Sequence, residues 1–337
     1  MRSKDARGLF QRPGGYLLLA LILLLAALLA LRAGSAPIGW KAFWGGLCRP
    51  ESYQTESVIL FKIRLPRIAA AILAGAGLSV SGALLQGVTG NALAGPNIIG
   101  VNAGAGFAVI LMLYFLPGLV LLVPAGAFAG AFLTTLLIVS LAARINQAKS
   151  TVILAGIAIT AMLNAGISLL SLLEPDLLAS YNYFSIGGLS NIRAGALGLP
   201  AVIILAGLLL ALLLSRRIDT LCLGDQLAAS LGIRVRRLRM LCLVIASACA
   251  AAVVSFAGLL GFVGLIVPHM ARKMAGSSMH RLLPVSVLTG ATLVTVADLL
   301  GRVLFAPSEL PVGIVMAFIG APFFFWLLLK RRNYADL

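Results

Sequence analysis

Long apolar runs separated by short polar segments recur along the whole chain. Each run approaches the roughly 20 residues that an α-helix needs to cross the hydrocarbon core of a bilayer. The apolar residues are continuous rather than alternating, which excludes a membrane β-barrel. The pattern predicts an all-α, polytopic membrane protein of about ten transmembrane helices, at residues 14–33, 65–86, 97–116, 117–141, 151–172, 195–214, 240–258, 259–272, 282–302 and 311–329.

Two of these runs are unusual, and one short motif recurs. The first run follows basic residues as a signal peptide would, but its length and its lack of a small-x-small cleavage site favour a retained span. The run at 259–272 is short and predicts a partial helix.

A short motif occurs twice in the chain, as S-G-A-L-L at 81–85 and as F-A-G-L-L at 256–260. The two copies lie in spans expected to run in opposite directions, which points to an inverted repeat.

Composition agrees with one transmembrane domain over residues 1–337. The chain is 61% hydrophobic and 11% charged, with a mean hydropathy of +1.07. Its net charge of +16 reports membrane orientation rather than affinity for nucleic acid, because Lys and Arg gather in cytoplasmic loops. With the N-terminus inside, most Lys and Arg residues fall on the inner side, so we expect both termini in the cytoplasm.

The sequence carries few signs of catalysis or of ion coupling. The four cysteines, at 48, 222, 242 and 249, lack metal-ligand or C-x-x-C spacing, so we expect no metal site or disulfide. No P-loop motif is present, so we expect no ATP site on this chain. No Lys, Glu or Arg lies mid-span, which argues against an ion-driven carrier. Asp298 lies nearest, and we expect Arg302, four residues on, to neutralise it.

The most polar segment of the chain, at about 215–239, contains six arginines and must lie in water or at the interface. Within it, Gly224 to Gly232 predicts one short helix. Asp225 would supply the N-cap oxygen, and Gly232 would take the left-handed position after the helix. The segment is either a solvated connector or a surface that docks another protein.

The span at 151–172 carries a stripe of uncharged polar residues at helical spacing, Thr160, Asn164, Ser168 and Ser171. Such a stripe could line a route for a bulky polar cargo. Alternatively, these groups bond neighbouring helices or their own backbone carbonyls. We favour the pathway.

Three further motifs border the spans. Arg64 and Arg67 flank Pro66 at the start of the second span, and we expect both to point toward the outer surface, where lipid phosphates or an acidic partner would balance them. The stretch from Asn91 to Asn97 contains Gly95-Pro96, which predicts a tight turn. Pro268, His269 and Arg272 are expected to end the eighth span, where His269 and Arg272 would satisfy terminal carbonyls; a lone His there is structural rather than catalytic.

Together, seven stretches resemble the membrane subunits of type II ABC importers, the FecCD-type permeases for ferric siderophores, haem and cobalamin. The matching runs are R-L-P-R at 64–67, S-G-A-L-L-Q at 81–86, N-A-L-A-G-P at 91–96, L-G-D-Q-L-A-A-S-L-G at 223–232, G-F-V-G-L-I-V-P-H-M-A-R at 261–272, A-D-L-L-G-R at 297–302 and E-L-P-V-G at 309–313. The family pattern N-P-L-A-D/E-P is altered here by Ala92 and Gly95, so no acidic residue acts at that turn.

This resemblance implies a type II permease fold of ten helices in the bacterial or archaeal plasma membrane. It implies a dimer with a second copy or a paralogue, around a pathway lined by the fifth and tenth spans. An inner gate would lie at Lys149, Ser150 and Thr151. An external or periplasmic solute-binding protein would dock on Arg64, Arg67 and Arg302. Two cytoplasmic ATPase subunits, which hold the ATP and Mg, would couple through Asp219, Gly224, Asp225, Gly232, Arg234, Arg236 and Arg237.

The expected function is therefore transport, not enzymatic catalysis. This chain would bind no cofactor and would contact membrane lipid and protein partners but no nucleic acid. The breadth of the family favours a ferric siderophore as cargo, with haem, cobalamin and an oxyanion left open. The rivals from other classes are an ion-coupled secondary transporter or channel that works alone, and an integral membrane enzyme.

Overall fold

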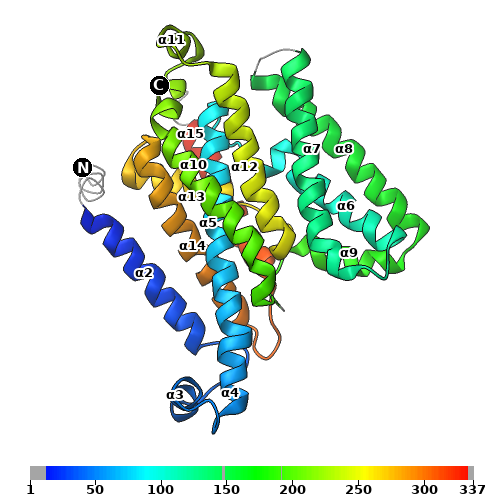
Figure 1. The fold of residues 1–337 in the computed structure, drawn as a ribbon, viewed down its shortest axis with the longest axis vertical. Coiled ribbons are helices and arrows are strands. Elements are labelled where there is room, and N and C mark those ends of the chain that lie inside the picture. The colour runs from blue at the N-terminus through cyan, green and yellow to red at the C-terminus, as the bar shows by residue number, and fades with distance from the viewer. Residues whose placement is uncertain (1–12, 146–148, 191, 333–337) are drawn as a thin grey trace.

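The computed structural model describes residues 13–145, 149–190 and 192–332, and every regular element within these ranges is a helix. Helix α5 (Leu65–Thr89) is central and buried along most of its length. Four helices surround it and contact it: α10 (Gly198–Cys222), α12 (Val235–Ala257), α13 (Val263–Ala275) and α14 (Met279–Val303) (Figure 1). The core of the molecule is thus organised around α5.

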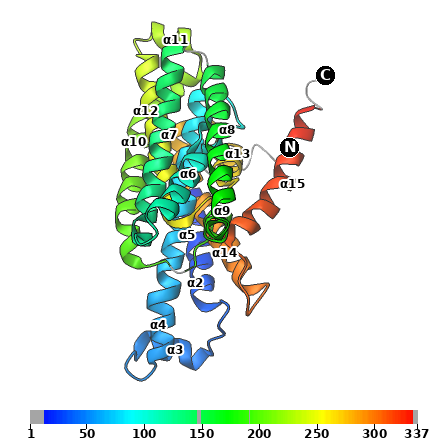
Figure 2. The same ribbon diagram turned by 90° about the vertical axis from the view of Figure 1, so that its right-hand side faces the viewer.

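The other long helices pack on the sides of this group. One side carries α6 (Val101–Phe115), α7 (Val123–Ile145), α8 (Lys149–Leu173) and α9 (Asp176–Ile186), joined to the core by contacts of α7 with α12. On the other side, α2 (Pro13–Arg32) lies along α14. Helix α15 (Val312–Arg332) contacts α13 and α14 and leans away from the bundle (Figure 2).

The two ends of the bundle differ. At one end, which we call the α3 end, lie α3 (Trp40–Cys48), α4 (Gln54–Val58) and the π-helix η1 (Ile59–Arg64), which continues into α5 (Figure 1). At the other, the α11 end, α11 (Asp225–Ser230) joins α10 to α12. Short 3₁₀ helices connect other elements, at Pro96–Ile99 (η2), Val120–Leu122 (η3) and Ala194–Leu197 (η4).

Each of the ten predicted spans overlaps a helix. Among the described residues, seven helices are long and apolar enough to cross a membrane, and Val101–Phe115 and Val312–Leu327 are shorter apolar helices. Helix α13 has 13 residues, so the run at 259–272 is a partial helix as predicted. Ten crossings stay a prediction. The sequence did not indicate α3, α4 or α9, and α10 continues well past residue 214.

Helices of the core approach one another through glycine. A methyl group on Gly82 would overlap the carbonyl oxygen of Gly264, and one on Gly75 would overlap that of Gly290. Such contacts bring α5 against α13 and α14 at backbone distance, which gives packing energy where lipid offers no hydrophobic drive. They place Gln86 and Arg67, both on α5, beside partners on those two helices.

Two series of four helices follow the same order of lengths (long, short, long, long), as an inverted repeat would, and the repeat itself stays a prediction. Helices α5 to α8 have 25, 15, 23 and 25 residues, and α12 to α15 have 23, 13, 25 and 21. Each short helix follows a residue of left-handed backbone, Gly100 (φ 75°) or Phe262 (φ 64°). Helix α5 starts at the α3 end and α12 at the α11 end, so the series are opposed. The five-residue echo does not coincide with this repeat, because 81–85 lies inside α5 whereas 256–260 spans the end of α12.

Candidate functional site

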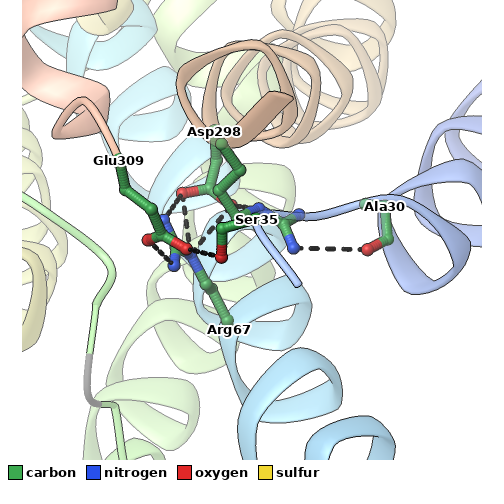
Figure 3. Close-up of polar contacts among 6 residues, drawn as sticks. Ala30, Ser35, Arg67, Asp298 and Glu309 are labelled. Atoms are coloured by element: carbon green, nitrogen blue, oxygen red, sulfur yellow. Dashed lines mark hydrogen bonds and ion pairs between the residues drawn. The ribbon is translucent and has the colours of Figure 1, made fainter. Parts of the chain in front are cut away.

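An ion cluster joins α5 to α14 at the α3 end (Figure 3). The Arg67 guanidinium lies against the Asp298 carboxylate, with Nη2 2.9 Å from Oδ1, and its Nη1 is 2.6 Å from Oε2 of Glu309. Arg302 reaches Oδ2 of Asp298 at 3.1 Å, so the predicted pair of these two residues is confirmed. Because Arg67 also binds Asp298, the carboxylate is shared between two cations rather than held by one.

The same cluster caps helix α2. The last carbonyls of a helix have no intrahelical donor and carry the negative end of the helix dipole. Arg64 donates from Nη1 to the carbonyls of Leu31 and Arg32, at 2.8 Å each, and from Nη2 to that of Ala36 at 2.5 Å. Arg302 donates to the carbonyl of Ala30 at 3.3 Å. These two arginines therefore fix the end of α2 against η1 and α14.

The predicted orientation of the arginines is wrong. Arg64, Arg67 and Arg302 are only 3%, 6% and 2% exposed, so they cannot meet a partner's carboxylates directly in this conformation. The sequence suggested surface cations because it did not show that α2 ends beside these arginines. It also did not show that Asp298 and Glu309 lie next to them in the fold. Their balance comes from carboxylates and helix carbonyls of this chain, neither of the two sources that we expected.

Glu309, in the loop between α14 and α15, closes the cluster toward solvent. It accepts a hydrogen bond from the Ser35 hydroxyl at 2.5 Å, besides the bond from Arg67. Burial alone would raise the pKa of this carboxyl, but the Ser35 and Arg67 hydrogen bonds and the charges of Arg67 and Arg302 outweigh it and lower the pKa. Glu309 is therefore ionised at neutral pH and holds the loop onto α5.

At the opposite end, the short helix predicted between Gly224 and Gly232 is confirmed as α11. Its C-terminus is a Schellman motif, in which Ile233 N–H bonds the Ala228 carbonyl and Gly232 N–H bonds that of Ala229, both at 3.0 Å. Gly232 has φ 80°, the left-handed conformation that the sequence predicted. This turn directs the chain from α11 into α12.

The start of α11 differs from the prediction. Gly224, with φ 122°, is the N-cap, and no side chain caps the helix. Asp225 lies one residue later, where its carboxylate accepts from Nη2 of Arg239 at 2.7 Å and 2.8 Å. Glycine takes the cap position because this φ is strained for other residues. Asp225 thus ties α11 to α12 rather than closing its own helix.

Asp219 connects two long helices at this end. Its Oδ1 accepts from the Met279 backbone N–H at 2.7 Å, and its Oδ2 accepts from the Ser278 hydroxyl at 2.9 Å. Met279 is the first residue of α14, so an α10 side chain satisfies a free donor there and complements the positive end of its dipole. Asp219 therefore ties the end of α10 to the start of α14.

The surface around α11 is both apolar and basic. Leu223, Leu227 and Leu231 are exposed, at spacings of four residues. Arg234 and two of its neighbours, Arg236 and Arg237, are exposed beside them, as are Arg216 and Arg217 on α10. Exposed leucines outside the apolar part of a span are characteristic of a protein-docking surface.

The polar stripe of α8 lies at the edge of this helix's contact with α6. Asn164 and Ser168 are exposed, whereas Thr160 and Ser171 are half-buried. Asn164 has exposed apolar neighbours on the same helix, among them Ile157 and Leu172. An amide on such a surface requires polar partners that hydrocarbon does not supply.

The predicted inner gate lies in a segment whose backbone, but not its side chains, the structure describes. Lys149, Ser150 and Thr151 form the first turn of α8, at the α11 end, and their side chains lie outside the described part of the structure. The gate therefore stays a prediction.

The turn after α5 is displaced from its predicted position. Asn91 Oδ1 accepts from Leu93 N–H at 2.9 Å, and Ala94 N–H bonds the Asn91 carbonyl at 3.0 Å. The tight turn is thus an Asx-type turn at residues 91–94. Gly95 is extended, and Pro96 opens the 3₁₀ helix η2.

Pro268 does not end its helix, because α13 continues to Ala275. A proline inside a helix has no N–H for the carbonyl four residues earlier, here that of Gly264. Gln86 of α5 donates to this carbonyl from Nε2 at 3.2 Å, and Arg272 donates to Oε1 of the same Gln86. Arg272 therefore links α13 to α5 instead of capping α13.

His269 packs against Phe323 of α15 in a T-shaped arrangement, with ring centroids 5.9 Å apart. This contact is one of the connections between α13 and the outlying α15. It agrees with a structural role for His269.

Comparison with known proteins identifies the family. Residues 21–330 match the family described as the FecCD transport family. The chain is 34% identical to the hemin transport system permease protein HmuU of Yersinia pestis, over 95% of this chain and 96% of that protein. It is 38% identical to the Fe(3+) dicitrate transport system permease protein FecD of Escherichia coli, over 91% and 95%.

A solved structure agrees with this assignment. An inward-facing conformation of a metal-chelate type ABC transporter matches with a TM-score of 0.83 and 31% identity, covering 95% of this chain and 100% of that one. The chain belongs to the FecCD transport family.

Proposed function

We propose that this FecCD-family chain is the membrane-spanning permease subunit of a binding-protein-dependent ABC importer. It would carry a metal chelate of the ferric siderophore type into the cytoplasm, driven by ATP hydrolysis on separate subunits. The observation that carries this proposal is α11, a short, firmly held helix with exposed leucines and arginines between two long apolar helices. Family membership and the names of the relatives support the same conclusion.

The α11 end is the cytoplasmic end in this proposal. Six arginines lie between Arg216 and Arg239, and cytoplasmic segments near membrane spans are enriched in basic residues. Helix α2 would then begin, and α15 end, on the cytoplasmic side. The α3 end would face outward, toward an external solute-binding protein.

The connections of α11 would transmit the work of the ATPase subunits. A displacement of α11 passes to α12 through the Schellman turn and the Asp225–Arg239 pair. A displacement of α10 passes to α14 through Asp219. Nucleotide-driven movement of the motor subunits would thereby rotate core helices and alternate the access of the pathway.

The pathway would lie between two permease copies or a copy and a paralogue, along α8 and α15. Both helices have apolar faces that this chain leaves uncovered, including Phe318 and Phe325 on α15 and Met162 and Leu169 on α8. Asn164 and Ser168 lie on the uncovered side of α8. A second subunit would cover part of this surface, and the polar stripe would face the cargo.

Docking of the binding protein would involve the exposed cap formed by α3, α4 and η1. Its exposed basic residues include Lys41, Arg49 and Lys62. The buried cluster of Arg64, Arg67 and Arg302 would hold this cap in place rather than contact the partner.

Reconstitution tests the proposal. Proteoliposomes containing the permease, its ATPase and its binding protein should accumulate a hydroxamate siderophore loaded with radioactive iron. Accumulation should require ATP on the side of the membrane where the ATPase subunits lie. Uptake of haem or cobalamin instead of the siderophore would support the proposed importer but change its proposed cargo. Uphill accumulation by the permease alone under an ion gradient would contradict the proposal in favour of a secondary transporter.

A further inference from the structure

A basic pocket lies between α10 and α12 at the α11 end, next to Leu231, whereas Leu223 and Leu227 do not line it. It has a volume of ≈ 450 Å³ and is lined by Arg217 of α10, by Arg234 and Arg237 at the start of α12, and by leucines of both helices. This volume is within the range of about 300–1,000 Å³ typical of small-ligand sites. The pocket is therefore large enough for a headgroup-sized anion.

The charge of the pocket has no counterpart among the residues that the structure describes. Within the described ranges, no hydrogen bond or ion pair involves the guanidinium groups of Arg217, Arg234 or Arg237. The two acidic residues of this segment are engaged elsewhere, Asp225 with Arg239 and Asp219 with the start of α14. Three exposed cations that converge without a carboxylate form a site that favours an anion from outside the chain.

The walls of the pocket indicate which anion. Leu214 of α10 and Leu238 and Leu241 of α12 line the side toward the middle of the bundle. The apolar surface continues along α10, where Leu213 is 71% exposed and Leu210 is also exposed. One helical turn, about 5.4 Å, separates Leu213 from Arg217. A molecule that fills this site has its charge at the arginines and an apolar part along α10.

We propose that this pocket, between α10 and α12, binds the phosphate headgroup of an anionic membrane phospholipid, with an acyl chain lying along α10. Arginine forms paired hydrogen bonds with phosphate oxygens, and basic pockets between membrane helices on the cytoplasmic side bind anionic headgroups. The bound lipid would join α10 to the α11–α12 turn at the point where α11 is attached. The site is independent of the cargo and can be tested without transport.

Native mass spectrometry of the full-length permease, stripped of lipid in detergent, tests the site. Phosphatidylglycerol should bind at least tenfold more tightly than phosphatidylcholine. The double variant Arg234→Gln/Arg237→Gln should lose this preference. The matched control Arg216→Gln/Arg281→Gln removes the same charge from exposed positions at the same end, outside the pocket, and should keep it.

Three outcomes would overturn the proposal. Equal affinity for the two lipids, or an unchanged preference in the pocket variant, would remove the lipid site. Displacement of phosphatidylglycerol by millimolar inorganic phosphate would assign the pocket to the free ion. Loss of ATPase-subunit binding in the pocket variant, with lipid binding unchanged, would assign the pocket to the motor protein. The proteins should unfold at the same temperature, because the four substituted arginines are exposed.

Discussion

The guanidinium group of Arg67 and the carboxylate of Asp298 lie in contact, 231 residues apart in the chain, and both are almost fully buried. Arg67 begins the central helix, and Asp298 lies near the end of a neighbour that runs alongside it. Burial of two charges costs hydration energy that only their mutual attraction and further hydrogen bonds offset. Here Glu309 accepts a hydrogen bond from Arg67, and Arg302 adds a second ion pair to Asp298, so each member of the cluster offsets the burial of another.

Asp298→Asn should therefore destabilise the permease strongly. The substitution leaves Arg67 and Arg302 buried with one carboxylate fewer, and breaking a buried ion pair by removing one partner costs about 3–5 kcal/mol. We expect a lower thermal unfolding temperature in detergent and a shorter half-life on heating. The double variant Asp298→Leu/Arg302→Met should recover part of this loss, because Arg67 keeps its ion pair with Glu309. Equal unfolding temperatures for Asp298→Asn and the wild type would show that the cluster does not stabilise the fold.

Glu309 makes stability dependent on pH in the acid range. Its pKa in the folded protein lies below the ordinary value of 4.5, so its contribution is complete above that pH and is lost as the pH falls through the folded pKa. At neutral pH, Glu309→Gln should unfold at a lower temperature than the wild type, and this gap should close on acidification below about pH 4.5. A gap that stays constant down to acid pH would contradict the lowered pKa.

Substitutions at Arg64 and Lys62 can distinguish a role in folding from a role in docking the solute-binding protein. Both are basic residues of η1, but Arg64 caps α2 and is buried, whereas Lys62 is exposed. Arg64→Gln should lower the unfolding temperature, because it leaves helix carbonyls without donors, at about 1–3 kcal/mol for each unsatisfied group. Lys62→Gln should leave that temperature unchanged and weaken binding of the solute-binding protein, measured by surface plasmon resonance. The reverse pattern would restore Arg64 as a docking residue.

The sequence predicted those parts of the fold that depend on local pattern. Apolar runs of span length marked the long helices, and Gly232 marked the end of α11, since glycine supplies the positive φ there; the N-cap was assigned to Asp225, whereas Gly224 occupies it. The helices α3, α4 and α9 were missed because they are short and lack apolar runs of span length. The proline at 268 was interpreted as a helix end, because the substitute donor comes from Gln86 on another helix.

Contacts between distant residues were not predictable in the same way. Arg64 and Arg67 were assigned to the surface because nothing near them in sequence balances their charge. The balancing groups are the last α2 carbonyls at 31 and 32, the loop carbonyl at 36, and the carboxylates of Asp298 and Glu309. The one pair within a single helical turn, Asp298 and Arg302, was identified correctly. Asp219 was assigned to coupling without any sign that it caps α14.

Leu227 tests whether α11 is the surface on which the motor docks. Its side chain is exposed, so Leu227→Ser should fold normally. If an ATPase groove receives this leucine, loss of its burial should weaken the association by about 1.5–3 kcal/mol, which is at least tenfold in affinity. Co-purification and cargo-stimulated ATP hydrolysis measure the effect. Ser230→Ala is the matched control, since Ser230 lies on the same helix and is exposed. Normal coupling in Leu227→Ser would place the docking surface elsewhere.

Asn164 tests the pathway. Its side chain is on the uncovered face of α8, so removal of its amide should leave the subunit's own packing intact. Asn164→Leu should reduce ATP-driven uptake of the chelate several-fold while expression, unfolding temperature and basal ATP hydrolysis stay unchanged, because an apolar side chain offers the cargo no hydrogen bond. Met162→Leu, at an exposed position two residues earlier, should transport normally. If instead Asn164→Leu lowers the unfolding temperature or separates the dimer while the uptake per intact transporter is unchanged, the amide joins helices and does not contact cargo.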